Sequence, residues 1–111
     1  MTVLPNAAKA EIEEAKLRDY LLSSAHPVGR FKAYTLNALG YTRENWVRLH
    51  HDLLNHGRAG DCVVGDCTLH GQKFKVSGTL VGPNGRRMRY VSVWIIAPDS
   101  STPRFITAFP E

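Results

Sequence analysis

Apolar residues recur at helical spacing in the first half of the chain and alternate with polar residues in the second half. The change falls near Gly57, because Leu and Ala dominate before it and β-branched residues, Gly and Pro increase after it. A spacing of three or four residues indicates amphipathic helices, and a spacing of two indicates half-buried strands. The sequence therefore predicts one domain over residues 1–111, with a helical part at about 9–57 and a sheet part at about 60–110.

Three helices are expected in the helical part. The first runs from about Lys9 to Ser23, with glutamates in its early turns, where the helix dipole favours negative charge. The second runs from near Val28 to Leu39, and Gly40 is its C-terminal stop. The third follows Thr42, which we predict as its N-cap, and ends at Gly57.

Four strands are expected after the helices, at residues 61–69, 72–81, 86–97 and 104–109. The tetrapeptide Gly-Pro-Asn-Gly at residues 82–85 predicts a hairpin turn between the middle two. In the last strand, simple alternation places Phe105, Thr107 and Phe109 on one side and Ile106 and Ala108 on the other.

Helices that precede a run of hairpin-linked strands indicate the α+β class. We predict N-terminal helices packed on one face of a C-terminal antiparallel meander sheet of about four strands. The other face can then stay partly open, as is common for antiparallel sheets. That face would carry polar and basic side chains, including Lys73, Lys75 and Thr107.

The charge favours an acidic partner such as nucleic acid. The formal net charge is +4 and the pI is about 9.3, although an ordinary solvated surface gives the same numbers. The longest apolar run, Val91 to Ala97, is too short to span a bilayer, and no signal peptide is evident. We therefore expect a cytoplasmic protein that does not associate with membranes.

The cysteines and histidines predict no metal site, and no cofactor motif is present. Cys62 and Cys67 lie five residues apart, which places them on opposite faces of a strand and argues against a disulfide. His50 and His51 point about a hundred degrees apart on a helix, and His56 is poorly aligned with both, so we expect these histidines on the helix surface.

A set of short motifs in a fixed order carries a resemblance to a known family. The motifs are Lys16-Leu17-Arg18-Asp19-Tyr20-Leu21-Leu22, His26-Pro27-Val28-Gly29-Arg30-Phe31-Lys32, Leu39-Gly40-Tyr41-Thr42, Gly71-Gln72-Lys73-Phe74, Gly82-Pro83-Asn84-Gly85-Arg86, Val93-Trp94-Ile95-Ile96 and Ile106-Thr107-Ala108-Phe109-Pro110. Together they resemble the bacterial family named domain of unknown function 6883, over nearly the whole chain.

A looser similarity concerns the fold. Helices followed by a four-stranded meander, a His-x-x-x-x-x-Lys segment ahead of a helix, and a final Thr-Ala-Phe-Pro strand resemble the barnase, EndoU, colicin and RelE-like nucleases. Domains of that kind cut RNA as toxins in toxin–antitoxin or contact-dependent systems. This resemblance implies a ribonuclease by analogy of fold, which is an association and not a mechanism.

Metal-independent RNA cleavage needs a base, an acid and a cation, and His, Lys, Arg and Tyr supply these roles. His26 suits acid–base chemistry and lies in a short connection between two predicted helices. Lys32, in the first turns of the second helix, would hold the scissile phosphate. Thr107 in the final strand would position a phosphate or a catalytic group. Each also has a plain structural interpretation: a loop support, an exposed helix lysine and a strand threonine.

Basic residues around these three are expected to bind the RNA backbone. The local cluster after the predicted turn is the densest, and the others come from the second helix and the second strand. The expected substrate-binding residues are Arg30, Lys73, Lys75, Arg86, Arg87 and Arg89.

Three functions remain open at this level. The first is a ribonuclease toxin whose partners are RNA and a cognate antitoxin. The second is a non-enzymatic module that binds a protein, as an antitoxin, an immunity protein or a phage-encoded inhibitor does. The third is nucleic-acid binding through the open sheet face without cleavage, with Phe105 and Phe109 as stacking groups.

Overall fold

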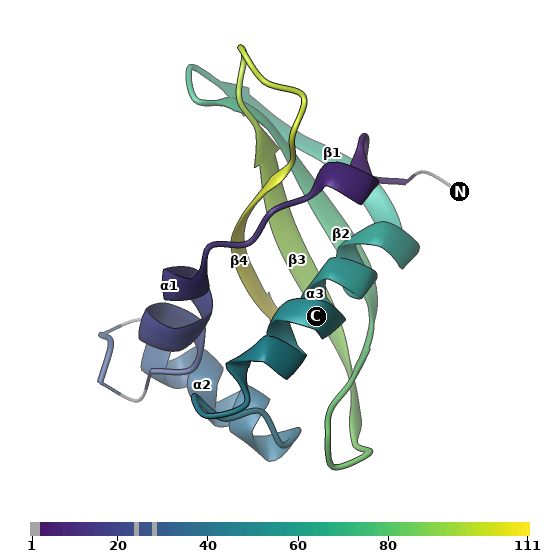
Figure 1. The fold of residues 1–111 in the computed structure, drawn as a ribbon. Coiled ribbons are helices and arrows are strands. Elements are labelled where there is room, and N and C mark those ends of the chain that lie inside the picture. The colour runs from purple at the N-terminus through teal and green to yellow at the C-terminus, as the bar shows by residue number, and fades with distance from the viewer. Residues whose placement is uncertain (1–2, 24, 28) are drawn as a thin grey trace.

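The helices pack on one face of a four-stranded antiparallel sheet with the strand order β1-β2-β3-β4 (Figure 1). This computed structural model describes residues 3–23, 25–27 and 29–111. The strands are β1 (Asp61–Thr68), β2 (Gly71–Val81), β3 (Arg87–Ile96) and β4 (Arg104–Pro110). The expected α+β fold, with helices before a meander, is confirmed.

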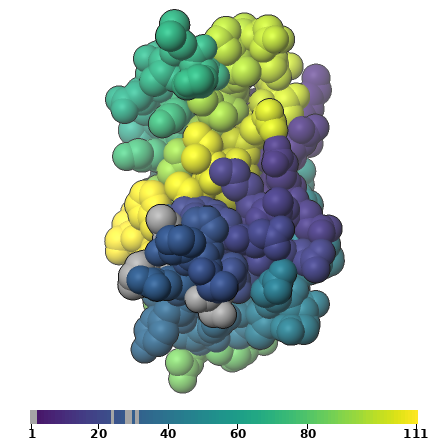
Figure 2. All heavy atoms as spheres, turned by 90° about the vertical axis from the view of Figure 1, so that its left-hand side faces the viewer, coloured from purple at the N-terminus to yellow at the C-terminus, as the bar shows by residue number. Residues whose placement is uncertain are grey.

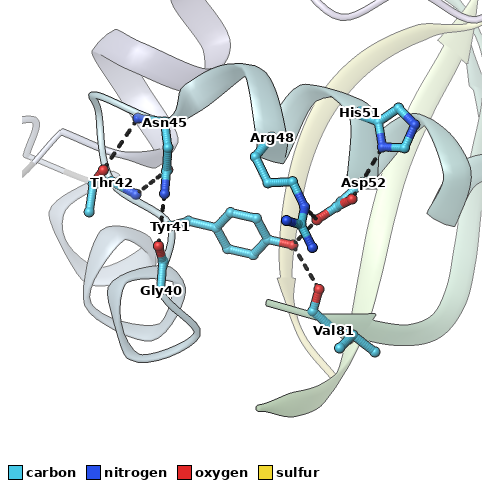
Figure 3. A network of polar contacts seen from close by, with 8 residues as sticks. All are labelled: Gly40, Tyr41, Thr42, Asn45, Arg48, His51, Asp52 and Val81. Carbon is cyan, nitrogen blue, oxygen red and sulfur yellow. Dashed lines mark hydrogen bonds and ion pairs between the residues drawn. The ribbon is translucent and has the colours of Figure 1, made fainter. Parts of the chain in front are cut away.

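The two longer helices follow the prediction with shifted ends. Helix α2 (Gly29–Ala38) ends just before Gly40, whose φ of 97° is strained for any other residue. Its expected start near Val28 lies outside the described residues. Helix α3 (Trp46–Ala59) begins four residues after Thr42, so Thr42 is not its N-cap. Thr42 instead accepts a hydrogen bond from the Asn45 N–H at 3.3 Å (Figure 3).

The expected single helix from Lys9 to Ser23 is wrong. The segment contains a 3-10 turn η1 (Ala7–Lys9), a short α1 (Glu14–Lys16) and a π-helical turn η2 (Leu17–Leu21). Between η1 and α1 the backbone is extended, because Glu11 hydrogen-bonds to Pro103 and Phe105 along the outer edge of β4. Tertiary pairing with a strand therefore overrides the local helical pattern there.

The predicted alternation is confirmed by burial in β2 but not in β3, where residues 90–94 are buried on both faces of the sheet. Phe74, Val76 and Leu80 of β2 are buried toward the helices, and Trp94 of β3, fully buried, lies on the same face. Cys62 is buried and Cys67 is exposed, and both are free thiols. Their expected placement on opposite faces is wrong, because a bulge between Val64 and Cys67 pairs Cys67 with Gln72, on the same face of β2 as Val76, the partner of Cys62.

A bulge in β4 corrects the prediction for Phe105. The register between β3 and β4 shifts between Val93 and Trp94, so that Phe105 pairs with Trp94 while Thr107 pairs with Val93. Phe105 is therefore buried on the helix side, with its ring 5.4 Å from that of Trp94 at 76°. It is not available to stack on a base, whereas Thr107 remains on the open face.

His56 is a core residue, so its expected place on the helix surface is wrong. Its Nε2 faces two carbonyl oxygens, of Tyr90 at 3.0 Å and Gly78 at 3.3 Å, and so must carry the hydrogen. Its Nδ1, 2.9 Å from Ser92 Oγ, then accepts the serine hydroxyl hydrogen. Ser92 Oγ in turn accepts from Trp94 Nε1 at 2.9 Å, which completes a buried network of the neutral histidine.

Protonation of His56 should destabilise the fold, because burial lowers the pKa of this histidine from its ordinary value of 6.5. Below about pH 6.5 the unfolded chain binds more protons than the folded one, so stability falls as the pH decreases. The slope contributed by His56 should reach at most about 1.4 kcal/mol per pH unit. Urea unfolding between pH 7.5 and 5 measures this slope. The range lies above the pH at which most carboxylates titrate, so their contribution is small.

The exposed His51 on the same helix provides the control for this measurement. His51→Gln should keep the wild-type pH dependence, and His56→Gln should be less stable at pH 7.5 but flatter with pH. An unchanged slope in His56→Gln would assign the pH dependence to other groups.

A second polar network ties the start of α3 to the end of β2 (Figure 3). The hydroxyl of the fully buried Tyr41 donates to Asp52 Oδ2 at 2.6 Å and lies 3.2 Å from the Val81 carbonyl oxygen. Arg48 Nε donates to the same carboxylate oxygen at 3.0 Å. Burial, with Asp52 adding to it, raises the pKa of Tyr41, so the phenol stays protonated and holds the junction together.

Candidate functional site

Lys32 and Thr107, which lie 75 positions apart in the sequence, are in direct contact at β4. Lys32 Nζ donates to Thr107 Oγ1 at 2.9 Å and approaches the Ala108 carbonyl oxygen at 3.4 Å. The hydroxyl of Tyr20 lies 3.1 Å from the same Thr107 oxygen. An ammonium group and two hydroxyls therefore meet at one point, which we call the β4-edge cluster: Tyr20, His26, Lys32 and Thr107.

Aromatic rings surround the ammonium group of Lys32. Its Nζ is 5.7 Å from the ring centroid of Tyr20 and 5.5 Å from that of Phe109. The His26 ring packs edge-on against Tyr20, with centroids 5.0 Å apart and planes at 75°. Tyr20 thus connects His26 to Lys32 and Thr107, and all of these side chains are half-buried.

Three elements, η2, α2 and β4, and the connection between the first two supply the cluster, and the core anchors η2 and α2. Tyr20 comes from η2, whose Leu17 and Leu21 are fully buried. Lys32 is in the first turns of α2, which is held one turn later by Thr35, bonded at 2.8 Å to the Tyr90 hydroxyl. Figure 2 shows the C-terminal strand (yellow) beside the surface of residues from about 15 to 35 (dark blue).

Lys75 lies on the same open face as Thr107. The register places Lys75, Val93 and Thr107 side by side on β2, β3 and β4. Two strand spacings, or roughly 10 Å, separate the backbones at Lys75 and Thr107. Side chains at this separation can contact neighbouring phosphates of one nucleic-acid strand. Lys73 lies on the same face, one row further along β2. The structure therefore groups these two predicted binding residues near the cluster.

The predicted arginines are more dispersed. Arg89 is exposed on the open face, but Glu111 holds its Nε at 3.0 Å, and this contact lowers the pKa of the Glu111 carboxyl. Arg86 and Arg87 lie at the far end of β3, and Arg87 is six residues from Val93, roughly 20 Å along the strand. Arg30 is exposed on α2, two residues before Lys32.

Comparison with known proteins places the chain in a family. The model of the family described as "Domain of unknown function (DUF6883)" matches residues 3–111. The chain belongs to this family. No protein of curated function matches the sequence.

The fold of this DUF6883 chain is also found in a solved structure. A chain of the contact-dependent growth inhibition toxin–immunity protein complex from Klebsiella pneumoniae 342 superimposes with a TM-score of 0.67. The match covers 95% of this chain and 96% of that chain, at 17% sequence identity. At that identity the similarity establishes the shared fold.

Tyr20 is the member of the β4-edge cluster that was not predicted from the sequence. Its helical spacing within an apolar stripe is typical of a core residue, and no neighbouring residue marks it as functional. The π-helical turn that carries it is a better signal, because such turns are frequent at functional sites, but it is visible only in the structure.

A cleft of about 310 Å³ lies elsewhere on the DUF6883 fold, between α3 and β2. Asp52, Asn55, His56 and Thr79 are its polar lining, and no lysine or arginine lines it, so it is a poor site for a phosphate. Within the described residues, no three His, Cys, Asp or Glu side chains are grouped as metal ligands would be. No helix in that part of the chain is long and apolar enough to cross a membrane.

Proposed function

We propose that this protein is a metal-independent ribonuclease toxin of a bacterial toxin–antitoxin or polymorphic toxin system. The observation that carries the proposal is the β4-edge cluster, in which a histidine, a lysine and a threonine from distant segments surround one tyrosine. The fold shared with a chain of a toxin–immunity complex supports it. The lysines on the adjacent open face also support it.

The proposed reaction requires no metal ion. The 2′-oxygen of a ribose attacks the adjacent phosphorus, and the bond from phosphorus to the 5′-oxygen of the next nucleotide breaks. A base removes the 2′-hydroxyl proton, and an acid gives a proton to the departing 5′-oxygen. The products are a 2′,3′-cyclic phosphate and a 5′-hydroxyl, so neither water nor a cofactor is consumed in this step.

Three residues of the cluster, His26, Lys32 and Thr107, have a role in this proposal. His26 is the base, because histidine is the side chain that most often serves as a general base and this one borders the cluster through Tyr20. Lys32 stabilises the negative charge that builds up on the phosphorus-bound oxygens. Thr107 positions Lys32 through their 2.9 Å hydrogen bond. Lys75 and Lys73 bind neighbouring phosphates, with the arginines Arg30, Arg86, Arg87 and Arg89 as weaker, more distant contacts.

The decisive experiment is a gel of total cellular RNA incubated with the purified protein in EDTA. We expect the wild type to cleave RNA and His26→Ala to lose at least about 10²-fold of the rate, because general acid–base catalysis contributes that much or more. His70→Ala is the matched control, since His70 is exposed at the β1–β2 turn away from the cluster. It should cleave as the wild type does.

Two other outcomes are informative. Equal cleavage by the wild type and His26→Ala would keep the enzyme but reject His26 as its base. Intact RNA in every lane, from protein that expresses freely and is folded, would contradict the ribonuclease proposal.

A protein-binding module is the second candidate, and the exposed edge of β1 favours it. Val63, Val64 and Leu69 are 60–96% exposed along this strand and its turn, which is unusual for a sheet edge. Such an edge suits a protein partner, as expected if the chain is itself an antitoxin, an immunity protein or a phage-encoded inhibitor. A folded protein that leaves RNA intact would support this function.

A further inference from the structure

Within the β4-edge cluster, one hydroxyl hydrogen of Tyr20 or Thr107 is not donated to another member of the cluster. Lys32 donates to Thr107 Oγ1, so that oxygen accepts. Thr107 and Tyr20 each carry one hydroxyl hydrogen, and their contact at 3.1 Å uses one of the two, whichever residue donates it. The remaining hydrogen must point away from the pair, toward a third acceptor.

Lys32 presents a second donor at the same place. An ammonium group has three N–H donors, and its contacts with Thr107 and Ala108 account for two of them. Among the residues that the structure describes, no acceptor takes the third. The rings of Tyr20 and Phe109 also lie near the ammonium group and stabilise its charge without accepting a conventional hydrogen bond.

The position of Tyr20 is set by the backbone rather than by chance contact of a mobile side chain. The π-helical turn η2 has a wider ring of backbone atoms than an α-helix, and its two buried leucines anchor it in the core. This turn places the Tyr20 hydroxyl against β4 while its ring still contacts His26 and Lys32. A simple hydrophobic anchor would not require the hydroxyl to meet Thr107.

We propose that Tyr20 is a ligand-contacting residue, and that the Tyr20–Thr107 pair and Lys32 together bind one phosphate group. The pair supplies one O–H donor and Lys32 one N–H donor to the same phosphate oxygens. A charged N–H donor and a neutral O–H donor on groups in direct contact fit an oxyanion better than a neutral acceptor. The identity of the anion as an RNA phosphate rests on the proposed function; the donor arrangement does not.

The test is the binding of a 2′-O-methyl RNA oligonucleotide, which has RNA's phosphates but no 2′-hydroxyl to react. Fluorescence anisotropy measures its Kd for the wild type, Tyr20→Phe, Thr107→Val and Thr107→Ser. We expect Tyr20→Phe and Thr107→Val to weaken binding by about tenfold, as the loss of one hydrogen bond to a charged group does. Thr107→Ser keeps the hydroxyl and should bind more tightly than Thr107→Val.

Tyr34→Phe is the matched control, because Tyr34 is 79% exposed on α2 and the change removes the same hydroxyl. Thermal unfolding of each variant checks its fold, and if Tyr20→Phe does not fold, the contrast between Thr107→Val and Thr107→Ser decides. Wild-type affinity in Tyr20→Phe, or equal affinities of the two Thr107 variants, would overturn the inference. Failure of the wild type to bind the oligonucleotide would also overturn it.

The same proteins separate this inference from the proposed function. If the wild type binds the oligonucleotide in a Tyr20-dependent way but leaves natural RNA intact, the phosphate site stands and the ribonuclease proposal fails. If the wild type cleaves RNA and Tyr20→Phe both binds and cleaves equally well, the ribonuclease stands and the role of Tyr20 is rejected.

Discussion

Replacing Lys32 with methionine should slow RNA cleavage by on the order of 10²–10³-fold, which is the usual cost of removing one donor that stabilises charge in a transition state. Methionine keeps most of the unbranched apolar stem between the rings of Tyr20 and Phe109, while the ammonium group is lost. The rate of cleavage of a defined RNA, measured at saturating and limiting substrate, checks this. Both kcat and kcat/KM should fall.

Lys9→Met provides the control for Lys32→Met. Lys9 is exposed at the end of η1 and is not part of the cluster, but its loss changes the net charge equally. If both variants lose activity to the same small extent, Lys32 would act only through its charge, by general attraction of RNA.

Raising the salt concentration should weaken RNA binding by every variant, since phosphate contacts release counterions.

Truncation of Trp94 to alanine should lower the free energy of unfolding by about 3–5 kcal/mol, the range for large aromatic residues in cores. Trp94 is fully buried, stacks edge-on with Phe105, and donates to Ser92 in the His56 network. Gly57 leaves the room that the indole occupies, because a Cβ there would lie 2.6 Å from Trp94 Cζ2. Urea unfolding at pH 7.5 measures the loss.

Trp46→Ala is the comparison for Trp94→Ala, since Trp46 is only partly buried at the start of α3. Its loss should cost clearly less than that of Trp94. Equal losses at the two positions would show that the network around Trp94 adds nothing beyond the burial of an aromatic ring.

The sheet was predictable from the sequence because its signals are local. Alternation in β2 is a property of neighbouring residues, and so is the Gly-Pro-Asn-Gly turn, after which β2 and β3 pair from Val81 and Arg87 onward. The glycine that ends α2 is equally local. These signals can be identified without knowing which distant segment packs on the strand or helix, so the fold class followed from the pattern.

The errors arose where a distant segment changes a local preference. Residues 10–13 have a helical pattern but are extended, because Glu11 pairs with the edge of β4. Gly57 is a typical helix terminator, yet α3 continues through it to Ala59. The glycine is required there because Trp94 occupies the space that a side chain would fill. His56 has an ordinary helix position but lies buried against β3.

The candidate site shows the same division. The sequence by itself determined the fold class, most of the elements and the chemically able residues His26, Lys32 and Thr107, since composition and local pattern are enough for these. Only the tertiary structure decided that Lys32 meets Thr107 and that Tyr20 joins them to His26. The physical reason is that hydrogen bonds act over about 3 Å in space, and neither periodicity nor spacing along the chain encodes which distant segments the core brings within that distance.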